Sequence, residues 1–179
     1  MNGSRTKTPL VQSLSEHARR ALVPACLLLS GTANAETPLL PSIDRIVVRK
    51  AERTMELYAQ GQLVHTIAGV QLGRAPVGPK RFQGDKRTPE GRYTIDYGNP
   101  DSRYFLSLHI SYPNARDVAF ARSQGRSPGG LVFIHGQPND RPQGRVPGDW
   151  TDGCIAVSDE EMEALWRVVP DGAVIDILP

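Results

Sequence analysis

The sequence predicts a mostly β fold with one or two helices, and three observations carry this expectation. Short runs rich in β-branched and aromatic residues recur along the chain, separated by turns that contain Gly and Pro. Only two segments have the mixed polar and apolar character of a helix. The chain has 179 residues, a length that suits one domain with a buried core.

The first strands should form a β-meander. Residues 43–50 contain the apolar run Ile46-Val47-Val48, and residues 55–58 alternate in the manner of a partner strand. A turn at 60–62 leads into a third strand over 63–68. Residues 73–91 are rich in Gly, Pro and charged side chains, so they should form a long loop.

The middle of the chain should alternate between strands and one helix. Short strands are expected at 93–95 and 104–110, and a helix over 114–124. Pro128-Gly129-Gly130 ends the helical region. The continuous apolar run 131–134 is typical of a fully buried strand.

A long loop and a capped helix complete the predicted domain. Residues 136–149 contain three Pro and three Gly, and a loop of this length is usually functional. Ser158 and Glu161 have the spacing of a capping box, which predicts a helix that runs to about Val169. The last strand should cover 173–178.

The first 35 residues have the features of a signal peptide. Arg19 and Arg20 precede the short apolar run 21–29, and Ala33-Asn34-Ala35 has the form of a cleavage site. Weaker alternatives are a lipoprotein box that ends at Cys26 and a twin-arginine signal. We therefore expect residues 36–42 to be a short linker and 43–179 the folded domain. The protein should be exported to the periplasm or cell envelope, without stable membrane insertion after cleavage.

Cleavage would change both the charge and the cysteine count. The mature chain would carry 17 basic and 18 acidic residues, a net charge of 17 − 18 = −1. No basic patch or motif for nucleic acid is present, so nucleic-acid binding is not expected. Loss of Cys26 leaves Cys154 alone, and a lone Cys in an exported protein is either reactive or buried and inert.

Two residues have the positions of a nucleophile and its base. His135 ends the apolar run, and Cys154 follows Gly153 and precedes the capped helix. A nearby helix start should lower the pKa of the Cys154 thiol, and Gly153 allows a tight turn whose N–H groups could bind an oxyanion. The alternative for His135 is a purely structural histidine. Its pairing with a lone Cys favours catalysis.

These residues resemble the signature of the L,D-transpeptidase catalytic domain family, also called YkuD-like. The family signature begins with a His and, after a gap, continues with Ser or Thr, His, Gly and Cys. In this chain His135 is the first residue, residues 136–150 form a gap of comparable length, and the second part reads Thr151-Asp152-Gly153-Cys154. The resemblance extends over most of the chain from residue 43. Three further segments resemble segments of the family: Arg87 to Tyr93, Phe133 to Gly136, and Asp171 to Val174.

The resemblance implies a fold, a substrate and a reaction. The fold would be a β-sandwich-like arrangement of mixed sheets, with the Cys in a cleft under a flexible lid. The substrate would be the peptide stems of peptidoglycan, attacked at the bond between a diaminoacid and D-alanine. D-Alanine would leave, a thioester would form, and an amine from a second stem or from a wall-attached protein would resolve it. No metal or cofactor is implied.

The resemblance also assigns roles to single residues. Cys154 would be the nucleophile and His135 the base, with the Gly136 carbonyl orienting the imidazole. The N–H groups of Gly153 and Cys154 would stabilise the oxyanion. Thr151 occupies the Ser/Thr position of the family signature and is a candidate for substrate contact.

Other residues are candidates for substrate contact. Asp152 replaces the usual His of the family, and its carboxylate could meet a substrate ammonium. His109 could line the cleft or be structural, and Trp150 could pack or form a substrate platform. Arg92 could pair with a substrate carboxylate, although a solvated strand arginine is the simpler interpretation.

Three competing functions remain at this stage. Water in place of an amine acceptor would give an L,D-carboxypeptidase or a hydrolase of wall cross-links, and the sequence does not separate acceptors. A non-catalytic wall-binding module would have lost part of the His, Gly and Cys set, which is intact here. A papain-like protease is disfavoured because His135 precedes Cys154, the reverse of the order in that family.

Overall fold

The structure is a computed structural model that describes residues 40–141 and 144–179. The predicted signal peptide and most of the predicted linker lie outside these residues. The described chain forms eight strands and two helices, so the predicted mostly β class is confirmed. The elements in chain order are β1 (Arg45–Arg49), β2 (Thr54–Ala59), β3 (Gln62–Ala68), β4 (Gly91–Ser102), β5 (Phe105–Ile110), α1 (Ala115–Ser123), β6 (Val132–His135), β7 (Ile155–Ala156), α2 (Asp159–Val168) and β8 (Val174–Leu178).

The strands form one mixed sheet in the order β3-β2-β1-β8-β4-β5-β6-β7. The pairs β1–β8 and β6–β7 are parallel, and the other neighbours are antiparallel. The predicted meander is present as β1, β2 and β3. Gln60 and Gly61 both have positive φ between β2 and β3, which is the geometry of a two-residue hairpin turn that follows the strand twist.

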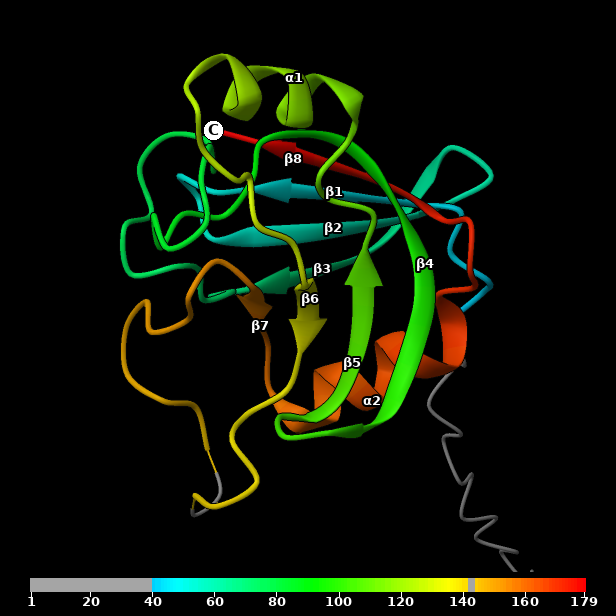
Figure 1. The fold of residues 1–179 in the computed structure, drawn as a ribbon. Coiled ribbons are helices and arrows are strands. Elements are labelled where there is room, and N and C mark those ends of the chain that lie inside the picture. Colours follow the sequence, from blue (N-terminus) through cyan, green and yellow to red (C-terminus); the bar gives the residue numbers. More distant parts are fainter. Residues whose placement is uncertain (1–39, 142–143) are drawn as a thin grey trace, which may run out of the picture. The chain divides into compact units, whose positions relative to one another are not determined.

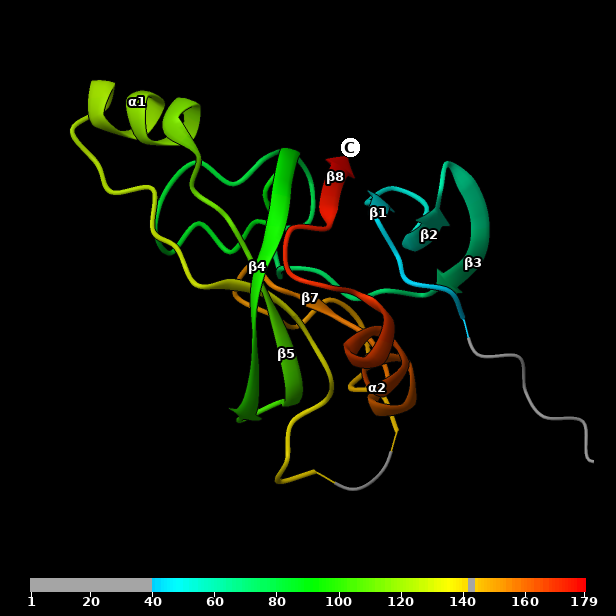
Figure 2. The ribbon, with the colours of Figure 1, turned by 90° about the vertical axis from the view of Figure 1, so that its right-hand side faces the viewer.

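Strand β4 connects the part of the sheet that contains β3, β2, β1 and β8 with the part that contains β5, β6 and β7. Its first residues, Gly91–Thr94, pair with β8, and the segment from Ile95 to Ser102 pairs with β5. Figure 2 shows that β4 and β5 lie apart from the group β1, β2 and β3, with β8 between them. The prediction of a short strand at 93–95 is therefore too short, because irregular register steps let β4 continue through Pro100.

The sheet edge formed by β6 and β7 differs from its prediction. Residues 131–134 were expected to be buried throughout, but Leu131 is 72 % exposed and Phe133 is half-buried. The side chains of β6 alternate instead: Val132 and Ile134 enter the core, while Phe133 lies on the opposite face. The short strand β7, directly after Cys154, is absent from the sequence prediction.

Both helices begin at a capping box, and the one formed by Ser158 and Glu161 confirms the prediction from the sequence. The Asn114 side chain accepts from the Asp117 N–H, and Ser158 pairs in the same way with Glu161. In Figure 1 the two helices lie at opposite ends of β5. Helix α2 packs against β5 and β6 with Met162 and Leu165 fully buried. It thereby supports β6, which ends at His135, together with the neighbouring strand β5.

Candidate active site

His135 is the last residue of β6, and it is only 3 % exposed. Its Nδ1 lies 2.7 Å from the carbonyl oxygen of Gly136. Because a carbonyl oxygen can only accept a hydrogen bond, Nδ1 carries the hydrogen and donates it. Nε2 then holds a lone pair and can accept a proton. This is the contact that the resemblance implied for Gly136, and the catalytic role of both residues stays a prediction.

Two aromatic side chains shield the imidazole of His135. Tyr104 stacks on it with ring centroids 4.6 Å apart, and Trp150 meets it edge to face at 5.5 Å. Burial lowers the pKa of His135 to about 4, although the hydrogen bond with Gly136 acts in the opposite direction. The ring is therefore neutral at neutral pH, which is the state that a general base needs.

A hydroxyl group holds the turn that leads into Cys154. Thr151 Oγ1 donates to the Cys154 carbonyl oxygen at 2.7 Å and accepts the Gly153 N–H at 3.1 Å. Gly153 has a φ of +130°, and a Cβ atom there would lie 2.6 Å from the Arg87 carbonyl oxygen. A side chain at this position would meet both backbone strain and a collision. Thr151 is buried and its hydroxyl holds the turn, while its role in substrate contact stays a prediction.

The thiol of Cys154 is partly exposed, and its Sγ lies 3.7 Å from the Leu131 carbonyl oxygen. Burial raises the pKa of Cys154, although a backbone hydrogen bond with Phe133 and the charge of Lys80 act in the opposite direction. The prediction of a pKa lowered by a helix start is wrong. Strand β7 separates Cys154 from α2, and the influence of a helix end fades within one turn.

Two cavities meet at Cys154. The histidine pocket has a volume of about 430 Å³, and its walls include Asn99, Tyr104, Leu131, Phe133, His135 and Cys154. The lysine pocket has a volume of about 580 Å³, and its walls include Lys80, Lys86, Gly129, Asp152, Gly153 and Cys154. The thiol thus lies between a cavity that contains the base and a cavity that contains charged side chains.

Asp152 lies on the wall of the lysine pocket, where its carboxylate is already paired. Lys86 Nζ lies 2.7 Å from Oδ2, and Arg74 donates to Oδ1. The neighbouring charges of Lys86 and Arg74 hold the pKa of Asp152 below its usual value. The predicted pairing with a substrate ammonium would therefore compete with two cations of the same chain. Within residues 40–141 and 144–179, no group of three His, Cys, Asp or Glu side chains is placed to hold a metal ion.

Two of the predicted substrate contacts lie away from both pockets. His109 Nδ1 is 2.6 Å from Asp96 Oδ1, and the His109 ring stacks on Tyr97 with centroids 4.6 Å apart. Arg92 lies on β4 and pairs with Asp176 across to β8 at 2.7 Å. The sheet itself accounts for the partners of both residues, and neither lines the histidine pocket or the lysine pocket.

Trp150 lies at the site, in contact with the base. Its ring is held against His135 and Tyr104, and its Nε1 donates to Gln71 Oε1 at 3.2 Å. Gln71 Nε2 in turn donates to the Gly148 carbonyl oxygen at 2.7 Å. Trp150 therefore packs against the imidazole and is anchored by Gln71, which ties it to the loop before the nucleophile.

Three further residues build the site without a recognisable signal in the sequence: Tyr104, Gln71 and Lys80. Tyr104 was assigned only to a strand, and Gln71 and Lys80 lie in or beside a loop without a recognisable motif. A buried lysine is rare unless it has partners, yet sequence alone does not show that Lys80 is 5 % exposed. The sequence predicts residues 73–91 only as a long loop, and loops of such length often carry functional residues.

A family model and a curated relative both match this chain, and both carry the name L,D-transpeptidase. The model of the YkuD family, the L,D-transpeptidase catalytic domain, matches residues 43–177. An Escherichia coli K12 protein named "Putative L,D-transpeptidase YafK" is 29 % identical over 161 residues. That match covers 82 % of this chain but only 58 % of the relative, so the chain spans little more than half of the curated relative's length. No helix among the described residues is long and apolar enough to cross a bilayer.

Solved structures show the same fold. The helical cell shape determining protein Pgp2 from Campylobacter jejuni matches with a TM-score of 0.61 and 25 % identity, over 76 % of this chain and 48 % of that one. Bd1075 from Bdellovibrio bacteriovorus matches with a TM-score of 0.54 and 22 % identity, over the same shares of the two chains. Since the family model covers three quarters of the sequence, the chain belongs to the L,D-transpeptidase catalytic domain family.

Proposed function

We propose that this protein is a cysteine-dependent peptidoglycan L,D-transpeptidase, with Cys154 as nucleophile and His135 as base. One observation carries the proposal: the thiol and the neutral imidazole line the same cavity, and Nε2 of that imidazole has its lone pair available. A nucleophile, a base in the same cavity and a group that orients the base are the parts that covalent acyl transfer needs. The substrate class follows from membership of the family.

In the proposed acylation step, His135 Nε2 takes the proton of the Cys154 thiol as Sγ attacks the carbonyl carbon of the diaminoacid. The carbonyl oxygen becomes an oxyanion, and the C–N bond to D-alanine then breaks. The proton on Nε2 passes to the departing nitrogen, so D-alanine leaves as a neutral amine. A thioester between the stem and Cys154 remains, and His135 is again neutral.

The second step reverses the roles. An amine from another stem attacks the thioester carbonyl, His135 removes its proton, and the Cys154 thiolate leaves and is protonated. Of the two expected oxyanion donors, the Gly153 N–H is engaged by the Thr151 hydroxyl. The Cys154 N–H is not part of that contact, and we assign oxyanion stabilisation to it.

Water in place of the amine would give the same thioester and a different product. The enzyme would then be an L,D-carboxypeptidase that shortens tetrapeptide stems to tripeptides. A wall-attached protein is a further possible acceptor, because its free amine would attack the same thioester. We propose export to the cell envelope for all three cases, since residues 1–35 have the order of features of a signal peptide.

Mass spectrometry of the purified protein with tetrapeptide muropeptides tests the proposal. We expect a mass gain equal to the stem without D-alanine, and no gain on Cys154→Ala. Full product formation by Cys154→Ala would rule out the assigned nucleophile. The ratio of cross-linked dimer to tripeptide in the same reaction separates transfer to an amine from transfer to water.

A further inference from the structure

The lysine pocket contains a charged group that the proposed mechanism does not use. Lys80 lines this cavity together with Cys154 and Gly153, although its side chain is only 5 % exposed. A Cβ atom placed on Gly153 would lie 3.8 Å from Lys80 Nζ, so the ammonium lies directly beside the nucleophile turn. At this position its charge favours the thiolate of Cys154 and partly opposes the burial that raises the thiol pKa.

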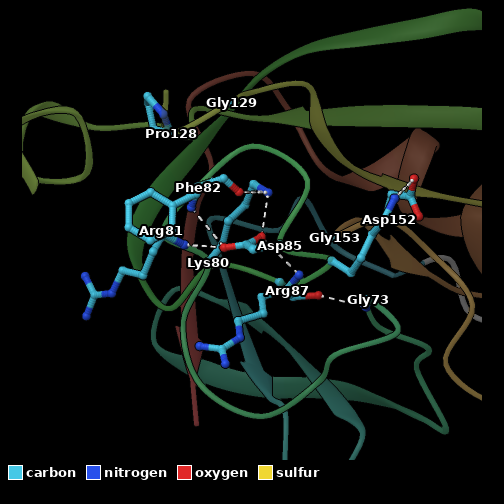
Figure 3. A network of polar contacts seen from close by, with 12 residues as sticks. Gly73, Lys80, Arg81, Phe82, Asp85, Arg87, Pro128, Gly129, Asp152 and Gly153 are labelled. Carbon is cyan, nitrogen blue, oxygen red and sulfur yellow. Dashed lines mark hydrogen bonds and ion pairs between the residues drawn. The ribbon is translucent and has the colours of Figure 1, made fainter. Parts of the chain in front are cut away.

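A compact loop holds the ammonium of Lys80 in place. The Asp85 carboxylate accepts the N–H groups of Arg81 and Phe82 at 2.6 and 2.9 Å, and it lies 3.0 Å from Lys80 Nζ (Figure 3). Burial acts to raise the pKa of Asp85, but these hydrogen bonds hold it below its usual value. A charged carboxylate therefore anchors the lysine, and the loop between them fixes its position.

A second buried lysine makes the position of Lys80 informative. An ammonium donates three hydrogen bonds. Lys50 uses all three, to Gly78 O at 2.8 Å, Thr88 O at 3.2 Å and Glu90 Oε1 at 2.8 Å.

Lys80 uses only two donors among the described residues, to Phe82 O at 3.1 Å and to Asp85. The Tyr112 ring centroid lies 6.0 Å from Nζ, so the third N–H of Lys80 has no oxygen acceptor among the described residues and is available to a group that enters the cavity.

The charge of this region favours an anion. Three cations, Lys80, Lys86 and Arg74, stand against two carboxylates, Asp85 and Asp152, which leaves an excess of one positive charge. Asp152 is occupied by Lys86 and Arg74, so it does not neutralise Lys80. A carboxylate with access to the lysine pocket would gain a charge-assisted hydrogen bond from a fixed, desolvated donor.

The position of His135 indicates which part of the substrate enters the lysine pocket. In the proposed reaction Nε2 gives its proton to the departing D-alanine, so the leaving group must lie on the side of the histidine pocket. His135 lines that pocket and not the lysine pocket. The acyl portion, which stays on Cys154, then extends toward Lys80. A diaminodicarboxylic acid such as diaminopimelate has a second carboxylate at the end of its side chain in this acyl portion.

We propose that the lysine pocket binds the free side-chain carboxylate of the diaminoacid attacked by Cys154, through the ammonium of Lys80. This inference rests on the proposed function and adds a substrate preference to it. The enzyme should act on stems that carry diaminopimelate with a free second carboxylate. It should disfavour stems in which that carboxylate is amidated, and stems that carry lysine, which lacks the group.

Two tetrapeptide stems that differ only in the second carboxylate of diaminopimelate, free or amidated, provide the test. We expect the wild-type protein to form the thioester about 10- to 100-fold faster on the free acid, the usual effect of one hydrogen bond to a charged group. Equal rates on the two stems would overturn the inference and leave the proposed function intact. Absence of thioester on both stems would instead overturn the proposed function and the inference that depends on it.

Two lysine variants connect the preference to one side chain. Lys80→Met should bring the rates on the free acid and on the amide to a common value, so that the ratio of the two rates falls to about one. The loss of a positive charge beside Cys154 acts on both stems alike and cancels in this ratio. Lys50→Met is the matched control, because it also removes a buried ammonium but lies outside the pocket; it should lower the melting temperature and keep the preference. Retention of the preference by Lys80→Met would refute the role of Lys80. If that variant does not fold, the comparison of the two stems on the wild type still decides.

Discussion

The two pockets on either side of Cys154 differ in their side chains: one contains aromatic rings and an imidazole, and the other contains a cluster of charged groups. The histidine pocket places a neutral imidazole against Tyr104 and within reach of Trp150. The lysine pocket contains Lys80 and Lys86 with their carboxylate partners. A group that exchanges protons has to be easily converted between its two forms, whereas a group that recognises charge has to keep one form. The contrast suggests a division between chemistry on one side of the thiol and recognition on the other.

The largest effect should come from removal of the base. His135→Ala should slow thioester formation about 100- to 10,000-fold, the range that general-base catalysis supplies. Mass spectrometry of the acylated protein measures this rate, and labelling of Cys154 by iodoacetamide at neutral pH should slow as well. His109→Ala is the matched control, since His109 pairs with Asp96 outside both pockets. Unchanged labelling of the His135 variant would remove it as the activating base.

The next largest effect should come from the turn that joins the two pockets. Gly153→Ala would place a Cβ atom 2.6 Å from the Arg87 carbonyl oxygen at a φ of +130°. Backbone strain of this kind costs about 1–3 kcal/mol before the collision is counted. We expect a lower melting temperature by calorimetry and at least about tenfold slower acylation. Gly172→Ala, with a φ of +90° and no atom within 4 Å, should lose stability but keep its activity; equal loss of activity would argue against a special role of Gly153.

A change in the aromatic wall should alter the pH dependence more than the maximal rate. Burial holds the pKa of His135 at about 4, so the base form of the wild type persists as the pH falls toward that value. Tyr104→Leu would admit water to the ring and raise this pKa toward the ordinary value of about 6.5. The acid limb of the kcat/KM profile should then move to higher pH, with a loss of activity at pH 5–6. Tyr97→Leu, which alters the ring stacked on His109 instead, should leave the limb in place.

The smallest effect should come from Arg92. Arg92→Ala removes a side chain that is 69 % exposed and pairs with Asp176, away from both pockets. Rates of acylation on the free-acid stem should equal those of the wild type, and the melting temperature should change little. A large fall in activity with a normal melting temperature would return Arg92 to the substrate site and weaken the division between the two pockets.

Local signals explain what the sequence predicts well. Ser158 and Glu161 mark a helix start because their mutual hydrogen bonds need only neighbours along the chain. The turn after β2 is also predictable, because it depends only on the backbone conformations of the adjacent residues Gln60 and Gly61. The pairing of His135 and Cys154 in one cavity could be inferred because the resemblance supplied the long-range geometry that spacing does not contain.

The features of the site that the sequence does not predict arise from contacts between distant segments of the chain. The pKa of Cys154 is raised because chain segments from distant parts of the sequence remove water from around the partly exposed thiol, and no local pattern indicates this environment. Lys80 reaches the nucleophile because the loop 69–90 folds back to bring Arg87 against Gly153. The Thr151 hydroxyl forms its hydrogen bonds within the turn, with Gly153 and Cys154. These partners depend on the backbone conformation, which the residue type alone does not indicate.

The protonated state of the Cys154 thiol has a consequence for the survival of the enzyme. Peroxides and disulfides react with thiolates far faster than with thiols. A nucleophile whose pKa is raised in the resting state, and which loses its proton only when His135 accepts it during attack, exposes little thiolate between turnovers. If the proposed signal peptide is removed, Cys154 is the one cysteine left, and its protonated state would slow sulfenic acid formation. The rate of Cys154 oxidation by dilute hydrogen peroxide measures this effect directly. Protection against oxidants and readiness for acyl transfer would then both follow from the same buried thiol.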